Sequence, residues 1–353
     1  MAVKSGNVYT AVVLQGGGAL GAYECGVLKA LFEQRPGFRP VAVAGISIGA
    51  ITAAVVGGAR GDPILALERL WRDKLTVSSG VWLPAQIDRS LAVLGNPGMY
   101  QLAPDFFTSP WSATSIYDTG PLRQTLTELV DPAALNDGGT RVVVGAIKVR
   151  TGEMEFFDSR GPGGLTFEHV AASGSLPPGF PMTVIDGQWY WDGGLFSNTP
   201  LSPAITALDE ASNGDPTAVR ELIVVELFPM DAPIPTTMPD VLERIVQLQY
   251  ASRLKLDQKF FDKIDRLVDL MAKIDGALTD RDDIRNDPTF KEMRAYRKIN
   301  HFNVVTSSLP AELSNASDFS RASIEARIKA GYSDAVAQGI RRVDSPKLRA
   351  GVT

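Results

Sequence analysis

A serine between two glycines is the first candidate for chemistry in this sequence. The segment Gly45-Ile46-Ser47-Ile48-Gly49 follows a short apolar run at 40–45 and begins the helix-like run SIGAITAAVVGGA. A sharp turn from strand to helix lifts a serine hydroxyl out of the sheet edge, and flanking glycines let the backbone crowd there. The pattern predicts that Ser47 is a nucleophile for acyl transfer and that Gly45 and Gly49 form its elbow.

Three consecutive glycines, Gly16, Gly17 and Gly18, lie at another predicted junction between a strand and a helix. Bare backbone amides at a helix start can form an oxyanion hole, because they are oriented before the negative charge develops. Gly16, Gly18 and Gly21 also satisfy the G-x-G-x-x-G dinucleotide fingerprint, which requires an acidic residue at the end of the second strand. Here that strand ends in Val43-Ala44-Gly45 and runs into the serine elbow, which disfavours a nicotinamide-cofactor protein.

The base that would activate the serine must be chosen from few residues, because the chain has only two histidines, His169 and His301. His301 has the chain order of an α/β-hydrolase triad, but that fold places several strands before its nucleophile, and Ser47 comes too early. His169 lies in FEHVAAS, which is typical of a helix packed on a sheet. Asp192 ends the strand GQWYW and enters a glycine turn. A carboxylate there can act as a base if burial raises its pKa, or it can simply form the turn.

Together these segments resemble the patatin-like phospholipase family. GGGALG, GISIGA some thirty residues later, and WDGGLFSNTP match that family in order, spacing and flanks. Ala172-Ser173 with Pro177-Pro178 resembles its block before the last core strand, and Asn198 with Pro200 matches its asparagine and proline after the dyad. The resemblance covers about residues 8–228.

The resemblance implies a dyad of Ser47 and Asp192, an oxyanion loop at Gly16, Gly17 and Gly18, and a three-layer α/β/α sandwich around a mainly parallel sheet. Leu20 is a departure, because many members have Arg or Lys in this loop, so backbone amides are the expected donors. The implied activity is that of a serine acyl hydrolase, a lipid esterase of phospholipase A or lysophospholipase type. We expect neither a cofactor nor a metal. The alternative is a catalytically idle patatin fold that binds lipid or serves as an interaction module.

The elements that must position these residues follow from hydrophobic patterns. A strand at 8–15, a helix ending near Pro36-Gly37, a strand at 40–45 and a helix ended by Gly57-Gly58 favour a parallel sheet with right-handed crossovers. A hairpin is expected at 141–149 and 153–158, and further strands at 187–191 and 221–228.

The character of the chain changes after Pro229. Residues 229–239 carry four prolines and are typical of a linker. We therefore divide the chain into a catalytic domain at 1–230 and a mainly helical extension at 231–353 packed on it. The pattern predicts one long helix at 240–275, whose apolar side would pack on the catalytic domain, and further helix at 289–299 and 320–340.

Composition places limits on location and partners. A formal charge of −5 and a pI near 5.3 argue against a general nucleic-acid binder. Cys25 is the single cysteine, so no internal disulfide is possible and nothing indicates an oxidising compartment. The start lacks the features of a signal peptide, and the uncharged run at 41–59 fits a buried strand and helix interrupted by glycines. We expect a cytoplasmic protein, with an acyl lipid as substrate and peripheral membrane contact; the pattern does not indicate an oligomeric state.

Large apolar residues gather at 77–111, in a turn-rich context that fits a lid, an acyl-chain channel or a structural connection. They include Trp82, Phe106 and Trp111, and tryptophan favours the lipid–water boundary. The helix after Asp240 has balanced charge, whereas a membrane-surface helix is normally rich in Lys and Arg. We therefore expect membrane contact through 77–111 rather than through that helix.

Overall fold

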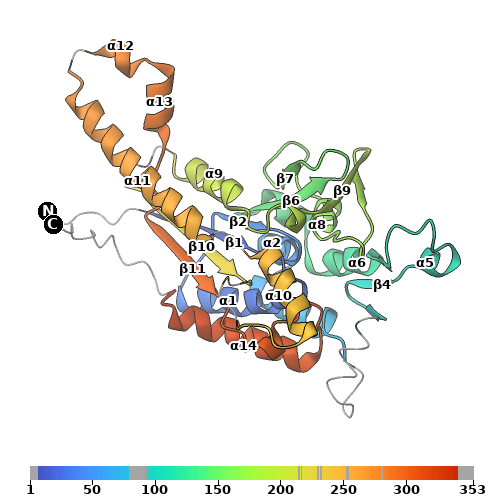
Figure 1. The fold of residues 1–353 in the computed structure, drawn as a ribbon. Coiled ribbons are helices and arrows are strands. Elements are labelled where there is room, and N and C mark those ends of the chain that lie inside the picture. Colours follow the sequence, from blue (N-terminus) through green and yellow to red (C-terminus); the bar gives the residue numbers. More distant parts are fainter. Residues whose placement is uncertain are drawn as a thin grey trace.

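A mixed sheet of eight strands forms the centre of the molecule (Figure 1). The computed structural model describes residues 7–78, 92, 94–213, 215, 217–228, 230, 233–251, 254–279 and 281–340. Its strands are β1 (Val8–Leu14), β2 (Ala42–Gly45), β6 (Arg141–Lys148), β7 (Met154–Asp158), β8 (Thr183–Ile185), β9 (Gln188–Asp192), β10 (Val219–Glu226) and β11 (His301–Thr306). They lie in the order β11-β10-β1-β2-β6-β9-β8, with β7 also paired to β6. The five strands from β11 to β6 run parallel, and β7, β8 and β9 add antiparallel pairs.

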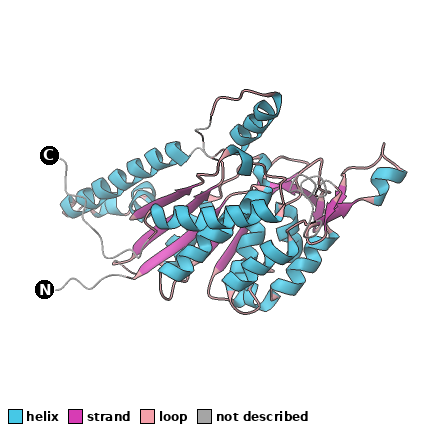
Figure 2. Ribbon diagram, turned by 90° about the horizontal axis from the view of Figure 1, so that it is seen from below, coloured by secondary structure: helices cyan, strands magenta, loops and turns pink. Residues whose placement is uncertain are grey.

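Helices connect these strands and cover both faces of the sheet (Figure 2). The helices of the N-terminal part are α1 (Gly21–Gln34), α2 (Ile48–Gly58), α3 (Pro63–Arg69), α5 (Pro104–Thr108), α6 (Gly120–Leu129), α7 (Pro132–Asp137), α8 (Phe167–Ser173) and α9 (Leu201–Ala211). Those of the C-terminal part are α10 (Met238–Tyr250), α11 (Leu254–Ala277), α12 (Asp282–Arg285), α13 (Pro288–Ala295) and α14 (Arg321–Ala337). Short 3-10 turns are η1 (Gly18–Leu20), η3 (Gly193–Leu195) and η4 (Ala311–Leu313), and η2 (Leu70–Lys74) is a π-helical turn. A small second sheet joins β3 (Gly95–Asn96), β4 (Tyr100–Leu102) and β5 (Tyr117–Asp118).

Alternation along the buried strands assigns side chains to two separate cores. Val12 and Leu14 of β1 pack with α1, α2 and α14, whereas Ala11 and Val13 pack with α9 on the other face. Successive strand residues point to opposite faces, so a strand buried on both sides must be apolar throughout. The structure is thus a three-layer α/β/α sandwich with a mainly parallel sheet, which confirms the expected fold class.

The strands and helices expected in the first 228 residues are present close to the predicted bounds. The expected hairpin is β6 and β7, which pair antiparallel. The prediction of one long helix at 240–275 is wrong, because the chain forms two helices, α10 and α11, with residue 251 between them outside helix. No helix of the described residues is long and apolar enough to cross a membrane.

The segment 231–353 contributes more than helices. Its strand β11 extends the central sheet by pairing parallel to β10, and α14 packs against α1 at very close range. A Cβ built on Gly331 would lie 2.1 Å from the carbonyl oxygen of Tyr23, so only glycine permits this approach. The Tyr23 hydroxyl also donates to Asp334 at 2.8 Å. In contrast, α11, α12 and α13 project from the molecule as an arm (Figure 1).

Candidate active site

Ser47 lies at the turn from β2 into α2, as the sequence predicts. Its φ of 56° and ψ of −120° place a non-glycine residue in a strained conformation. The neighbouring glycines make this turn possible, because a Cβ on Gly45 would lie 2.1 Å from the carbonyl oxygen of Gly49. A Cβ on Gly49 would lie 2.5 Å from the carbonyl oxygen of Leu14. The packing therefore explains the G-x-S-x-G pattern.

Asp192 lies at the end of β9 and is only 2% exposed. Its carboxyl accepts a hydrogen bond at 2.7 Å from the amide of Gly194 and lies beside the Ser47 hydroxyl. Burial raises the pKa of Asp192 to about 7, although the Ser47 hydroxyl and the Gly194 amide act to lower it. The two residues meet because β9 pairs with β6, which is the neighbour of β2.

The glycine loop approaches the same place from the end of β1. The amide of Gly16 donates to Asn198 Oδ1 at 2.9 Å, and Asn198 Nδ2 donates back to the Gly16 carbonyl at 2.9 Å. Gly18 has a φ of +54°, which favours glycine. Within the described part of the chain, nothing accepts a hydrogen bond from the amides of Gly17 or Gly18. These two amides are therefore available to an anion, whereas that of Gly16 is used to hold Asn198.

Ser173 supports the elbow from the side of β6. Its hydroxyl accepts from the amide of Ser47 at 3.0 Å and donates to the carbonyl of Gly145 at 2.7 Å. Ser173 is fully buried at the end of α8. The hydroxyl thus ties the strained turn to the neighbouring strand.

A cavity of about 580 Å³ opens over these groups. The Ser47 cavity has a polar floor and mostly apolar walls. The floor consists of Gly16, Gly17, Gly18, Ser47, Asp192, Gly194 and Asn198. Aromatic rings form one wall, with centroids of Tyr100 and Tyr117 4.7 Å apart and those of Tyr100 and Phe180 5.3 Å apart. An apolar chamber that ends on a serine hydroxyl, a carboxyl and free amides suits an acyl chain with an ester at its end.

Residues from the C-terminal third complete the walls of this cavity. Val246, Gln249 and Tyr250 of α10 line one side, and the segment 315–319 lines another. The ring of Tyr250 lies 5.7 Å from that of Phe228, and its carbonyl accepts from Asn198 at 3.3 Å. Sequence reasoning missed these residues, because no local pattern indicates that segments two hundred residues away meet the serine elbow.

Neither histidine lies beside Ser47 or Asp192. His169 caps its own helix through Thr166, and its ring stacks on Phe157 at 4.2 Å. His301 begins β11 opposite Glu221, near the start of β10, whereas Ser47 follows the other end of the parallel strands. The structure thus brings together Ser47, Asp192 and the glycine loop, and leaves both histidines elsewhere.

The segment 77–111 divides between the cavity and the surface. Trp82, Leu83 and Leu91 lie outside the described residues. Met99 and Tyr100 are buried and line the cavity. Phe107 is 64% exposed and Trp111 94% exposed on and after α5.

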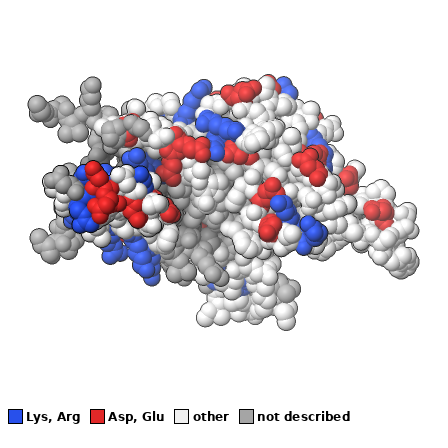
Figure 3. Space-filling view, turned by 90° about the horizontal axis from the view of Figure 1, so that it is seen from above, with Lys and Arg blue, Asp and Glu red and all other residues white. Residues whose placement is uncertain are grey.

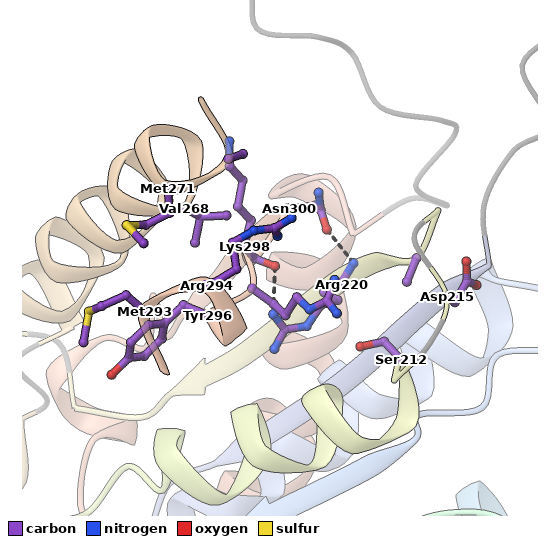
Figure 4. A pocket seen from close by; sticks show the side chains of 13 residues that line it. Ser212, Asp215, Arg220, Val268, Met271, Met293, Arg294, Tyr296, Lys298 and Asn300 are labelled. Carbon is purple, nitrogen blue, oxygen red and sulfur yellow. Dashed lines mark hydrogen bonds between the residues drawn. The ribbon is translucent and has the colours of Figure 1, made fainter. Parts of the chain in front are cut away.

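A second cavity of about 200 Å³ lies beside the start of β10 (Figure 4). Arg220 is buried there, and its Nη1 donates to the carbonyl of Lys298 at 3.0 Å. Other cations of this Arg220 cavity are paired with aspartates: Arg294 with Asp275 at 2.6 Å and Lys298 with Asp269 at 2.5 Å. Arg220 itself pairs with Asp209 at 2.7 Å. In the part of the chain that the structure describes, no three His, Cys, Asp or Glu side chains group as metal ligands.

Comparisons with known proteins identify the family of the chain. The model of the family described as patatin-like phospholipase matches residues 12–205, more than half of the chain. A second family model, DUF3734, described as patatin phospholipase, matches residues 248–341. None of the curated proteins matches the chain. The crystal structure of VipD from Legionella pneumophila is similar with 15% identity and a TM-score of 0.42, over 95% of this chain and 67% of that one. The chain belongs to the patatin-like phospholipase family, a family of lipid acyl hydrolases.

Proposed function

We propose that this protein is a serine acyl hydrolase for lipid esters, of phospholipase A or lysophospholipase type, with Ser47 as nucleophile and Asp192 as base. The observation that carries the proposal is that the Ser47 hydroxyl lies beside a buried carboxyl, whose pKa is raised to about 7, on the floor of one cavity. At neutral pH such a carboxyl is a far better proton acceptor than an ordinary aspartate, because its pKa lies near that pH. The strained elbow presents the hydroxyl to the cavity.

In the acylation step, Ser47 Oγ attacks the ester carbon while its proton passes to Asp192. The carbonyl π electrons move to the oxygen, and the amides of Gly17 and Gly18 donate to the oxyanion. As the tetrahedral intermediate collapses, the ester C–O bond breaks and the leaving alkoxide takes the proton from Asp192. The products are an alcohol and an acyl-Ser47 ester.

Hydrolysis of the acyl-Ser47 ester by water completes the cycle. Water attacks the acyl carbon while Asp192 takes its proton, and the same two amides stabilise the second oxyanion. Collapse returns the proton from Asp192 to Ser47 Oγ and releases a carboxylic acid. Of the three glycines predicted to form the oxyanion hole, Gly16 then acts by holding Asn198 rather than by donating its amide to the oxyanion.

We further propose peripheral contact with a lipid surface beside the Ser47 cavity. Phe107 and Trp111 are exposed on the lobe that continues from β4, whose Tyr100 lines the cavity. The apolar side of α10 was expected to be covered by packing, but among its described apolar side chains Val246 and Tyr250 are the ones that line the cavity. Its residues at i, i+3, i+7 and i+10 form an exposed stripe: Met238, Val241, Ile245 and Leu248.

Charged side chains are distributed unevenly between α10 and the arm formed by α11, α12 and α13. Figure 3 shows charges of both signs crowded over the lobe that holds α11 to α13, whereas Arg244 is the one charged residue among the described side chains of α10. A lipid surface accepts apolar side chains at about 1.5–3 kcal/mol each, which suits reversible attachment. The cytoplasmic location stays a prediction.

A hydrolysis screen over lipid classes tests the proposed function. Native protein and Ser47→Ala are offered phosphatidylcholine, lysophosphatidylcholine, acylglycerols and a short-chain p-nitrophenyl ester. The proposal expects release of fatty acid by the native protein and none by the variant. A folded native protein that hydrolyses none of them, and is equal to Ser47→Ala, would instead favour the idle lipid-binding module.

A liposome flotation experiment tests the membrane contact. Phe107→Ser with Trp111→Ser, and Ile245→Ser with Leu248→Ser, should each lower the bound fraction, because exposed apolar groups are removed without opening a core. Val268→Ser with Leu270→Ser on the arm is the matched control and should float like the native protein. Flotation unchanged in both test variants contradicts the proposed contact.

A further inference from the structure

The segment 313–319, of which residues 315–319 form a wall of the Ser47 cavity, also touches the glycine loop. The amide of Ala19 donates to the carbonyl of Ala316 at 2.7 Å. A Cβ built on Gly18 would lie 2.5 Å from the same carbonyl oxygen. The loop that offers free amides is therefore braced against a segment that lies three hundred residues further along the chain.

A single side chain connects the segment 313–319 to the glycine loop, and this connection is the joint. Arg327 of α14 is fully buried, and its guanidinium donates to four backbone carbonyls. Three of these belong to the wall: Leu313 at 2.9 Å, Asn315 at 2.8 Å and Asp318 at 2.5 Å. The fourth is Ala19, at 3.3 Å, directly after the glycine loop. Arg327 thus connects the wall and the loop through a single rigid group.

The chemistry of the side chain explains why arginine is needed. Guanidinium carries five donors in a fixed plane, so it can satisfy several carbonyls at once, whereas lysine carries three donors on one atom. The helix that carries Arg327 is itself fixed, because Asp318 accepts from the Ser323 hydroxyl at 2.7 Å and from the Ser320 amide at 3.0 Å. The joint is therefore rigid from α14 to the loop.

We propose that Arg327 is a positioning residue of the active site, which sets the glycine loop and the wall 313–319 relative to Ser47. The inference rests on the proposed function, since it assigns a role within the same reaction. Free amides help only when they lie at the place where the oxyanion forms, and a displacement of about 1 Å can lower a rate by about 100-fold. The segment matched by the second family model thus completes the catalytic site.

The test compares Arg327→Lys with Arg35→Lys on a soluble short-chain ester. Arg35 is the matched control, because it is also buried, donates to the Ile340 carbonyl at 3.0 Å and pairs with Glu221 near the start of β10. We expect kcat to fall about 10- to 100-fold in Arg327→Lys, with KM within about threefold of native, because the lost interaction acts on the transition state. Arg35→Lys should keep kcat within about threefold at equal folded fraction.

Two further readouts separate positioning from a general loss of stability. Hydrogen exchange at the Ala19 amide should accelerate at least about tenfold in Arg327→Lys and stay unchanged in Arg35→Lys. The apparent pKa of the rate profile should stay near that of the native protein, because Arg327 does not contact Asp192. Equal kcat in the two variants, or unchanged exchange at Ala19, overturns the proposal.

If Arg327→Lys does not fold, two milder substitutions test the proposal instead. Ser323→Ala removes one hydrogen bond from the joint, and Ser212→Ala removes a buried hydroxyl that donates to the Leu208 carbonyl at 2.6 Å. We expect kcat to fall about three- to fivefold in Ser323→Ala alone, and equal rates contradict the role of the joint. A native protein without ester hydrolysis would overturn the proposed function itself, which is a different result from an active native protein insensitive to Arg327.

Discussion

The Ser47 cavity and the Arg220 cavity lie at opposite ends of the same strand, β10. Phe228, just after the strand, lines the first cavity, and Arg220, at its start, lines the second. Both contain buried ionisable groups, but the groups differ in their partners. Arg220, Arg294 and Lys298 are paired with aspartates, whereas Asp192 accepts a hydrogen bond from one amide and lies beside a serine hydroxyl.

This difference favours the Ser47 cavity as the site of the proposed reaction. Ion pairs balance the charges of Arg220, Arg294 and Lys298, although Arg220 Nε and Nη2 make no hydrogen bond within the described residues. Beside Ser47, a strained backbone, free amides and a carboxyl of raised pKa remain together. In parallel sheets, ligands bind beyond the carboxyl ends of the strands, and the Ser47 cavity has that position.

The largest expected effect is that of removing the nucleophile. Ser47→Ala should lower ester hydrolysis by at least about 1,000-fold, because no acyl-enzyme can form. The matched control is Ser212→Ala, a hydroxyl that lines the Arg220 cavity and should leave the rate within about twofold. Rates are measured on a short-chain ester at equal folded fraction. More than a few per cent of native activity in a clean Ser47→Ala preparation contradicts the assignment.

Loss of the base should be nearly as severe. Asp192→Asn should lower kcat by about 10²–10⁴-fold, because an amide cannot accept the serine proton. His169→Gln and His301→Gln are the contrasting variants, and both should turn over near the native rate. A histidine variant as inactive as Ser47→Ala, with an active Asp192→Asn, would show that the dyad is wrong.

The pH dependence follows from the direction of the shift at Asp192. Its pKa is raised from 3.8 to about 7, so the carboxyl is protonated below that pH and cannot accept a proton. We expect kcat/KM to rise about tenfold per pH unit below pH 7 and to level off above it. The residual activity of Asp192→Asn should not show this rise of kcat/KM with pH below pH 7. A profile that levels off near pH 4 would mean that the acting carboxyl is an ordinary exposed one.

The smallest effect is expected at the second cavity. Arg297→Gln and Lys298→Gln remove cations from its lining, about 200 Å³ of space far from the serine. Exposed ion pairs contribute about 0–1 kcal/mol, so stability should change little. Ester hydrolysis should stay within about twofold of native. A loss of tenfold or more would show that the two cavities are coupled and would end the contrast between them.

The sequence predicts the residues whose surroundings are local. Ser47 and residues 16–18 lie at turns between a strand and a helix, and such turns leave glycine patterns in the chain. Asp192 could be found only with the help of the family resemblance, because its partner hydroxyl is 145 positions away in sequence. Local pattern and resemblance together thus identified the floor of the cavity.

The walls could not be predicted in this way. The strand β11 is short and carries His301 and Asn303 among its apolar residues, so its alternation is weak. The apolar residues at 240–275 keep their helical spacing past the end of α10, so the pattern gives no sign of the break between α10 and α11. One signal was present, since Arg327 lies between Ile324 and Ile328 on the buried side of α14. A lone arginine on an apolar stripe indicates a buried polar network, but not which carbonyls it binds.

Covalent labelling with a fluorophosphonate, followed by peptide mass analysis, tests the central claim most directly. The account predicts one adduct per chain on Ser47, formed faster as pH rises through about 7 and strongly slowed in Asp192→Asn. Labelling of another residue, or equal labelling of native protein and Ser47→Ala, would contradict it.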